Sequence, residues 1–302
     1  MAGPLQQDSL SAMVAYFRPP IGWWQVAKRT FQEIGDDNCL GLAAQMAFYF
    51  LLGLFPALLF LVALLSYLPE NFFPELLAAL SIVAPRELIA LIRGQLDQIA
   101  AGEAGGLLTA GIIGAVWSSS VAMVAIIDAL NRAYDIDEWR PWWKRRVLAI
   151  VLTVATAIFV LLAFALVLIG PRVVAFAAEW LDLEPAVVIV WAVLRWPVLI
   201  GCVVIGMDLV YHFAPNRRAR WTWITPGALV ATVLWVAISF GFKYYVANFG
   251  DYTATYGAIG GAIVTMLWFY LGGLAILIGA EINGVIEQAR RAEALASGPP
   301  GP

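Results

Sequence analysis

The sequence predicts an all-α integral membrane protein with six transmembrane helices, and three observations lead to this fold class. First, 62% of the 302 residues are hydrophobic and only 13% are charged, whereas soluble domains have about 45–50% apolar and about 25% charged residues. Second, six stretches are long and apolar enough for helices that cross a bilayer, which takes about 20 residues. Third, basic residues gather in alternate loops. A soluble enzyme, a disordered chain and a nucleic-acid-binding protein with a strong basic field are therefore excluded.

An N-terminal tail of residues 1–20 precedes a predicted cytoplasmic interfacial helix over residues 21–36. Apolar and basic residues separate onto opposite faces of this helix, which is typical of a helix lying along the membrane surface. The polar face carries Lys28 and Arg29. The apolar face comprises Trp23, Val26, Ala27, Phe31 and Ile34.

The membrane domain is predicted over residues 37–287. Five of its six spans contain no Asp, Glu, Lys or Arg, and the fourth contains only Arg195. Proline removes a helix hydrogen bond, so Pro56 in the first span and Pro197 in the fourth are candidate kinks or hinges. The spans are expected at about residues 40–68, 105–127, 147–170, 187–207, 221–242 and 252–280.

The loop between the first two spans, residues 69–104, is long for a plain connection and is predicted to be amphipathic. Pro85 is placed to open a helix there. This helix either lies on the outer surface or forms a lid over a cavity, and the pattern leaves both interpretations open. Its apolar side would comprise Leu88, Ile89, Leu91, Ile92, Leu96 and Ile99.

The distribution of charge predicts that both termini lie in the cytoplasm. Most of the 18 basic residues fall in the N-terminal segment, the second and fourth loops and the tail of residues 288–302, which is expected to be partly disordered. The loops assigned to the outer side hold only Arg86, Arg93, Arg172 and Lys243. The lipid bilayer is the predicted partner, and a homo-oligomer stays open.

Glycines concentrate at the start of the last predicted span, at Gly257, Gly260 and Gly261. Small residues let two helices approach closely, so helix packing is the simpler interpretation. The alternative is a helix loosened to bend or to expose its carbonyl groups to a substrate.

Arg195 is the charged residue within a predicted span. A charged side chain in hydrocarbon costs at least about 2.5 kcal/mol on insertion scales, so Arg195 is expected to face the bundle interior or a wet cavity. One interpretation is an internal ion pair or a set of carbonyl contacts. The other is a site for the carboxylate or phosphate group of an anionic ligand.

Three acids, Asp128, Asp208 and Glu281, each lie near the predicted cytoplasmic end of a span. Asn283 follows Glu281 closely, and Gln45 enters the first span at a similar depth. These residues form a polar cluster at the cytoplasmic mouth if their faces converge. The acids then either pair with cations at the interface or provide a coupling site for a proton or cation.

No catalytic, cofactor-binding or metal-binding constellation is present. The single histidine, His212, and the cysteines Cys39 and Cys202 do not assemble a Cys/His metal site. Nucleotide-binding loops and the GxSxG and HExxH motifs are absent from the sequence. We therefore expect no cofactor, no metal, no nucleic-acid partner and no enzymatic activity.

The chain resembles the YihY/BrkB family of bacterial inner-membrane proteins from about Trp23 to Ile286. The resemblance implies six spans and an inner-membrane location. The family has also carried an older label, ribonuclease BN. A metal-dependent ribonuclease needs metal ligands and a basic groove, and this sequence indicates neither. The family usually has Ser where Ala258 stands here. The likeness rests on Ala47-Phe48-Tyr49, Phe55-Pro56, Asn131-Arg132-Ala133-Tyr134, Arg140-Pro141, Lys144-Arg145-Arg146, Tyr211, Pro215-Asn216-Arg217, Pro226-Gly227, Tyr256-Gly257, Gly260, Trp268, Tyr270 and Gly279-Ala280-Glu281-Ile282-Asn283.

The leading functional hypothesis is a transporter or flippase-like protein for an envelope lipid or a small anionic solute. Because the sequence has no ATPase motif, such a protein would draw on an ion gradient. The alternative is a non-transporting membrane scaffold, or envelope-integrity factor, that binds partners through the 69–104 segment or the Trp-rich helix.

Overall fold

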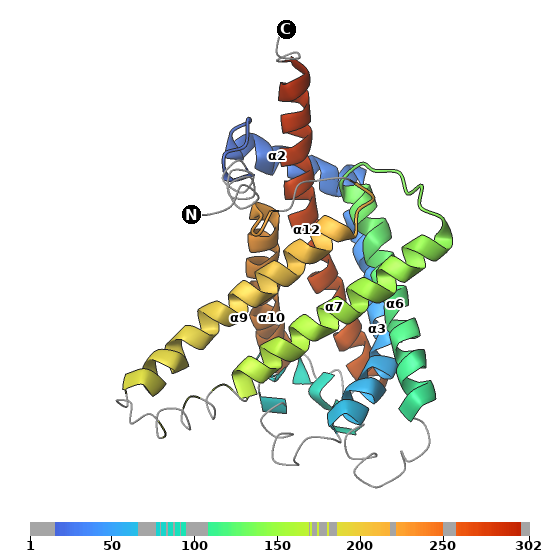
Figure 1. The fold of residues 1–302 in the computed structure, drawn as a ribbon, viewed down its shortest axis with the longest axis vertical. Coiled ribbons are helices and arrows are strands. Elements are labelled where there is room, and N and C mark those ends of the chain that lie inside the picture. The colour runs from blue at the N-terminus through green and yellow to red at the C-terminus, as the bar shows by residue number, and fades with distance from the viewer. Residues whose placement is uncertain are drawn as a thin grey trace.

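The structure is a computed structural model that describes residues 16–65, 77–78, 80–82, 84–86, 88–90, 92–94, 108–168, 170, 174, 180, 186–217, 222–249 and 258–296. Across these ranges the secondary structure is helical and contains no strand. The extended helices α2, α3, α6, α7, α9, α10 and α12 build the molecule (Figure 1). The structure therefore confirms the all-helical class.

Helix α2 (Trp23–Asp36) lies across the end of the bundle, and we call this end the α2 end (Figure 1). The chain bends by 65° between α2 and α3, at an elbow where Asn38 takes a positive φ of 52°. Val26 is buried against Val285 and Ile286 of α12. Phe31, by contrast, is 78% exposed. The residues predicted to form the apolar face of this helix thus divide between protein contact and the surface.

Four helices form the central bundle. Helices α3 (Cys39–Leu65) and α6 (Leu108–Ala133) pack on each other, and α12 (Ala258–Ala296) packs on α3, α6 and α10 (Pro226–Phe249). A buried core of mainly small and aliphatic side chains joins them, including Ala43, Met46, Ile127, Leu130 and Leu277.

Helices α10 and α12 cross with their backbones in contact. A Cβ atom added to Gly227 would lie 2.0 Å from the carbonyl oxygen of Gly279, and a Cβ on Gly279 would lie 2.4 Å from that of Gly227. Any side chain at either position would force the helices apart. Glycine therefore sets the distance between these two helices at the α2 end.

Helices α7 (Trp142–Leu168) and α9 (Ala186–Phe213) run obliquely to the central bundle (Figure 1). They pack on each other, while α7 also contacts α6 and α9 contacts α10. Their remaining surface is apolar and exposed, as expected for helices that face lipid. Examples are Val151, Ile158, Leu162, Val190 and Val193.

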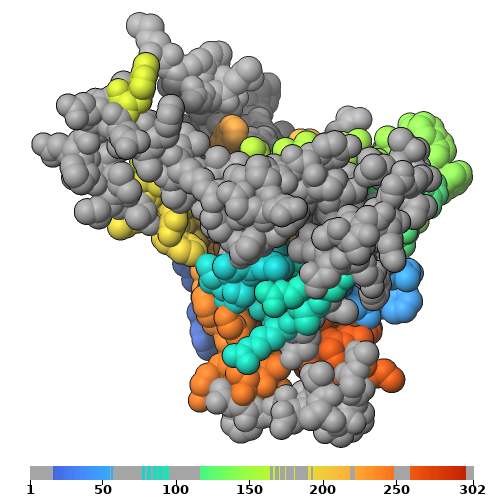
Figure 2. Space-filling view, turned by 90° about the horizontal axis from the view of Figure 1, so that it is seen from below, coloured from blue at the N-terminus to red at the C-terminus, as the bar shows by residue number. Residues whose placement is uncertain are grey.

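The described part of the 69–104 segment lies across the opposite end of the bundle, beside α10 (Figure 2). Leu77, Leu88 and Ile92 are buried. The amide of Ile89 donates to the carbonyl of Pro85 at 3.3 Å, so a helical turn opens at this proline. The ammonium group of Lys243 on α10 donates to the carbonyl of Ser81 at 2.6 Å. Leu91, Leu96 and Ile99 lie outside the residues whose side chains are described.

Four helices of the described chain are long and apolar enough to cross a membrane, or five if α2 and α3 together make one bent span. These four are α7, α9, α10 and α12. Pro56 and Pro197 both lie inside helices that continue through them. Gly260 and Gly261 stand in the first turn of α12, and Gly257 lies outside the described residues. The molecule is therefore a multi-pass helical membrane protein.

Candidate functional site

Two candidate sites stand out. One is an apolar pocket between the central bundle and the oblique pair α7–α9. The other is a set of polar side chains at the α2 end, which we call the polar layer; it includes Asp208, Thr225, Glu281, Asn283, Glu138, Arg140, Arg217 and Glu287. The polar layer gathers several residues that were singled out in the sequence, from segments distant along the chain. The pocket lies further along α9, towards the opposite end of the molecule.

The N-terminus of α10 brings Asp208 and Asn283 together. Thr225 caps this helix, because its hydroxyl oxygen accepts from the amide of Ala228 at 3.2 Å. Asp208, from α9, accepts hydrogen bonds from the Thr225 amide, at 3.1 Å, and from the Thr225 hydroxyl. The Asn283 side chain accepts from the amide of Gly227 at 3.0 Å and donates to the Thr225 hydroxyl at 2.9 Å. Both predicted site residues thus complete a helix cap.

Glu281 lies in the same layer but has a different partner. Its side chain faces α3, where the thiol of Cys39 donates to Oε1 at 3.2 Å. Glu281 is 1% exposed and Cys39 is fully buried. Within the described chain, Glu281 has no ion-pair partner.

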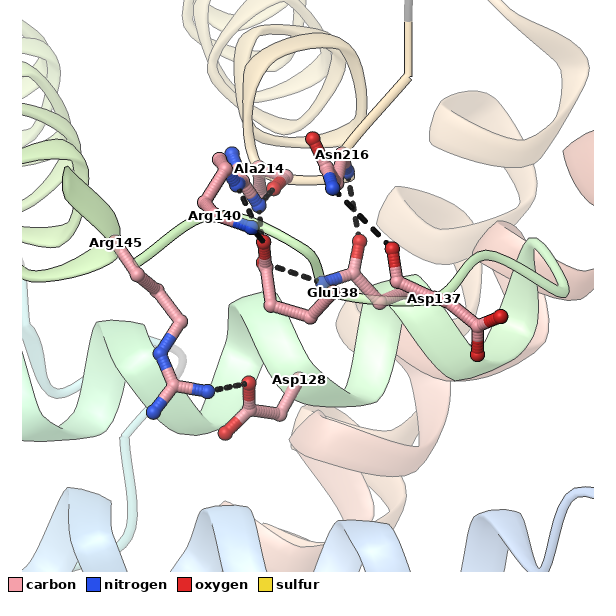
Figure 3. A network of polar contacts seen from close by, with 8 residues as sticks. Asp128, Asp137, Glu138, Arg140, Arg145, Ala214 and Asn216 are labelled. Atoms are coloured by element: carbon pink, nitrogen blue, oxygen red, sulfur yellow. Dashed lines mark hydrogen bonds and ion pairs between the residues drawn. The ribbon is translucent and has the colours of Figure 1, made fainter. Parts of the chain in front are cut away.

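Asp128 lies apart from these two acids. It accepts a hydrogen bond from Arg145 on α7 at 2.8 Å, and both side chains are partly exposed (Figure 3). Gln45 is exposed on α3. The structure therefore joins Asp208 and Asn283 through Thr225 and leaves Asp128, Glu281 and Gln45 in separate surroundings.

A second polar network ties the α6–α7 loop to the end of α9 (Figure 3). Arg140 donates to both carboxylate oxygens of Glu138, at 2.8 and 2.6 Å, and to the carbonyl of Ala214 at 2.8 Å. The Asn131 amide donates to Glu138 at 2.8 Å, while its oxygen accepts from the backbone of Asn216 at 2.7 Å. These contacts fix the α9–α10 connection against α6.

Glu138 is electrostatically distinct within this network. Burial alone would raise its pKa, but hydrogen bonds from the side chain and backbone of Arg140 and from Asn131 outweigh that effect. The pKa of Glu138 therefore lies below its ordinary value. The carboxylate form is the one that holds the network together.

Arg217 connects the same loop to α12. Its guanidinium pairs with Glu287, donates to the carbonyl of Tyr211 at 3.3 Å and lies 4.1 Å from the ring centroid of Tyr134. The Arg217 side chain is only 8% exposed. This buried ion pair holds the second half of α12 against the end of α9.

The apolar pocket has a volume of about 270 Å³ and opens between the oblique helices and the central bundle. Its lining is apolar apart from Thr156 and the thiol of Cys202. Five helices contribute lining residues: Met123 and Ile126 from α6, Phe159 and Ala163 from α7, Cys202 and Gly206 from α9, Trp235 from α10 and Ile276 from α12.

Arg195 lies on the pocket face of α9. Cys202 follows it by seven residues, close to two helical turns, which places Arg195 about 10 Å further along the same face. Its guanidinium lies 5.4 Å from the ring of Trp196. Its Nε atom is buried and makes no hydrogen bond, and no carboxylate pairs with Arg195 in the described part of the chain. The residue therefore has an unpaired, buried Nε on the pocket side of α9, beyond the residues that line the pocket itself.

Several residues of the polar layer escaped the sequence analysis. Thr225 had a usable signal, because Thr before Pro226 is a common start of a helix. Glu138 and Glu287 had no such signal. Arg140, the partner of Glu138, lies two residues away in the α6–α7 loop, and Arg217, the partner of Glu287, lies 70 positions away in the α9–α10 connection. Arg217 was expected as a possible ion-pair partner of the membrane acids, but the structure pairs it with Glu287, and Arg140 pairs with Glu138.

The fold and the apolar candidate spans define a polytopic helical membrane protein. The chain belongs to the BrkB family, because the family model described as "Virulence factor BrkB" matches residues 30–301. Several residues that carried the resemblance in the sequence, namely Asn131, Asn216, Gly227 and Asn283, make hydrogen bonds at the α2 end.

Curated relatives agree with this membership. The chain is 37% identical over 249 residues to YfkH of Bacillus subtilis, whose name calls it ribonuclease-like; the match covers 82% of this chain and 90% of that protein. It is 30% identical over 290 residues to a UPF0761 membrane protein of Ralstonia nicotianae, covering 89% of this chain and 61% of that protein. A UPF0761 membrane protein of Pseudoalteromonas translucida is 26% identical over 294 residues, covering 90% and 88%. No solved structure matches the chain.

Proposed function

We propose that this protein is a six-span bacterial inner-membrane protein with both termini in the cytoplasm. Helices α3 and α6 would add two spans to the four that satisfy the length and hydropathy criteria. The α2 end would be cytoplasmic, because Arg132, Arg140, Arg145 and Arg217 all lie there and basic residues stay on that side. Trp24 and Phe31 of α2 would anchor in the interface.

We propose that its function is transport of an anionic amphiphile, an envelope lipid or a small anionic solute with an apolar part. The observation that carries this proposal is the position of Arg195 on the same face of α9 as the apolar pocket. Ligand pockets have volumes of about 300–1,000 Å³, so a 270 Å³ cavity fits the apolar part of a ligand better than a whole lipid. The anionic group would then reach the guanidinium.

Transport on this scheme draws its energy from an ion gradient, because the sequence has no nucleotide-binding loop. We also propose that the protein is not an enzyme. Its polar layer is occupied by helix caps and ion pairs, and no group of three or more His, Cys, Asp or Glu side chains in the described chain is placed to hold a metal ion. On this proposal, the ribonuclease-like activity in the name of YfkH is not assigned to this protein.

The test is lipid and anion flux in proteoliposomes containing the purified protein, with and without a proton gradient. We expect Arg195→Ala to lower flux by about 10- to 100-fold, since a hydrogen bond to a charged group contributes about 1.5–3 kcal/mol and each 1.4 kcal/mol is a factor of ten. Arg93→Ala is the matched control, because Arg93 is an exposed arginine of the 69–104 segment.

Equal flux in the wild type and the Arg195→Ala variant would contradict the role of Arg195. No flux of any tested lipid or anion from folded protein would instead favour the scaffold alternative. On that alternative, the exposed Trp24 and Phe31 of α2 are a surface for a partner protein.

A further inference from the structure

Two buried carboxyl groups occupy the same polar layer in opposite surroundings. Asp208 is 2% exposed and Glu281 is 1% exposed. Asp208 accepts from both the amide and the hydroxyl of Thr225, at the positive end of the α10 dipole. Glu281 accepts from the Cys39 thiol alone in the described chain, and a thiol is a weak donor. Only Asp208 is provided with the donors that stabilise a carboxylate.

The charges around Glu281 are also unfavourable for an anion. Helix α2 contributes Glu33, the elbow contributes Asp37 and the α6–α7 turn contributes Asp135, and all three act on Glu281 as negative charges. From α3 it meets Cys39. Arg132 of α6 is engaged by Asp37 at 3.1 Å. A charged carboxylate at position 281 would therefore be buried, weakly hydrogen-bonded and surrounded by acids.

Burial of an unpaired carboxylate is costly, and the usual outcome is that the group takes up a proton. We propose that Glu281 is a proton-binding site at the α3–α12 interface, whereas Asp208 has a structural role in the α10 cap, where Thr225 donates to it twice. Two acids at one depth thus have different tasks, set by the donors around them.

The position of Glu281 places its proton beside the bend between α2 and α3. Cys39 is the first residue of α3 and follows the 65° elbow directly. When Glu281 loses its proton, the carboxylate needs water or a cation, and access requires the α2–α3 elbow to move away from α12. Val26 and its contacts on α12 are the packing that this movement would open. The role of Glu281 as the coupling group rests on the proposed transport function, but the bound proton itself does not.

The proton is observable by infrared spectroscopy of the full-length protein in lipid vesicles. A protonated carboxyl has a carbonyl band separate from that of carboxylates. At pH 7 we expect this band in the wild type, its loss in Glu281→Gln and its retention in Asp208→Asn, which is the matched control. Cys39→Ala removes the thiol donor and should shift the band in frequency without abolishing it, which covers the case in which Glu281→Gln does not fold.

A spectrum without the band at pH 7, or a band that Asp208→Asn abolishes and Cys39→Ala leaves unshifted, would overturn the proposal. The transport link is separated by measuring flux on the same samples. The band in the wild type, with flux whose proton dependence disappears in Glu281→Gln, supports the coupling role. The band without any flux would uphold the proton site and count against the proposed function.

Discussion

At the residue scale, the acidic side chains at the α2 end have different roles. Asp208 completes a helix cap, Asp128 makes a partly exposed ion pair and Glu138 organises a loop. In the sequence, the membrane acids look alike, because each stands near the end of an apolar stretch. Their partners come from other helices, so only the packing distinguishes them.

The Glu138 network gives a prediction on pH. The pKa of Glu138 is below its ordinary value in the folded protein, because Arg140 and Asn131 donate to the carboxylate. The stabilisation is therefore present above the ordinary pKa of a glutamate and is lost as pH falls through the lower, folded-state pKa. Glu138→Gln should lower stability at pH 7 by about 1–3 kcal/mol, the contribution of hydrogen bonds to a charged group.

The measurement is the midpoint of thermal unfolding in detergent between pH 3 and pH 7. Destabilisation by Glu138→Gln should shrink towards acidic pH, where the wild type has lost the same interaction. Glu293→Gln, at an exposed position of α12, is the control and should leave the midpoint unchanged. A variant that matches the wild type at pH 7 would show that the network contributes no stability.

The residues that sequence reasoning located best were those with a local cause. Thr225-Pro226 had such a cause at the start of α10, but it was not used, and the span was expected from residue 221 instead. Arg195 was recognised as exceptional because a charge in an apolar span is costly. Its place on the pocket face was not predictable, because that depends on the oblique packing of α7 and α9 against the bundle, which no local pattern encodes.

At the element scale, the crossing of α10 and α12 depends on glycine. Gly279→Ala should destabilise the protein by several kcal/mol or prevent its folding, because the new Cβ would meet the Gly227 carbonyl at 2.4 Å and the Tyr211 hydroxyl at 2.6 Å. Gly241→Ala is the matched control in α10, with nothing within 4 Å of the added Cβ. There alanine should keep or raise stability, by up to about 1 kcal/mol.

Thermal unfolding and the yield of monodisperse protein in detergent would measure both variants. Equal stability of Gly279→Ala and Gly241→Ala would mean that the two helices do not cross as closely as the structure shows. In the sequence, the crowding of glycines in the last span is most apparent at Gly257, Gly260 and Gly261. The close backbone contact lies instead at Gly279. The sequence does not reveal it, because the partner glycine, Gly227, lies on another helix.

At the scale of the whole molecule, the high hydrophobic content and the long apolar stretches together predicted the all-helical membrane class. The number of spans is harder to establish, since α2 and α3 are bent and α6 carries polar residues at its end. The division into a central bundle and an oblique pair arises from tertiary packing. That division creates the pocket on which the proposed function rests.

The most direct test of the central claim is native mass spectrometry of the purified protein with phosphatidylglycerol or phosphatidylcholine. We expect the wild type to retain phosphatidylglycerol about tenfold more tightly, because only this lipid offers a net negative charge to Arg195. Arg195→Ala should lose the preference, and Gly206→Leu should weaken binding by filling the pocket, whereas Arg93→Ala should bind like the wild type. Equal retention of the two lipids by the wild type, or a preference that survives in Arg195→Ala, would contradict the assignment of this pocket and its arginine to an anionic amphiphile.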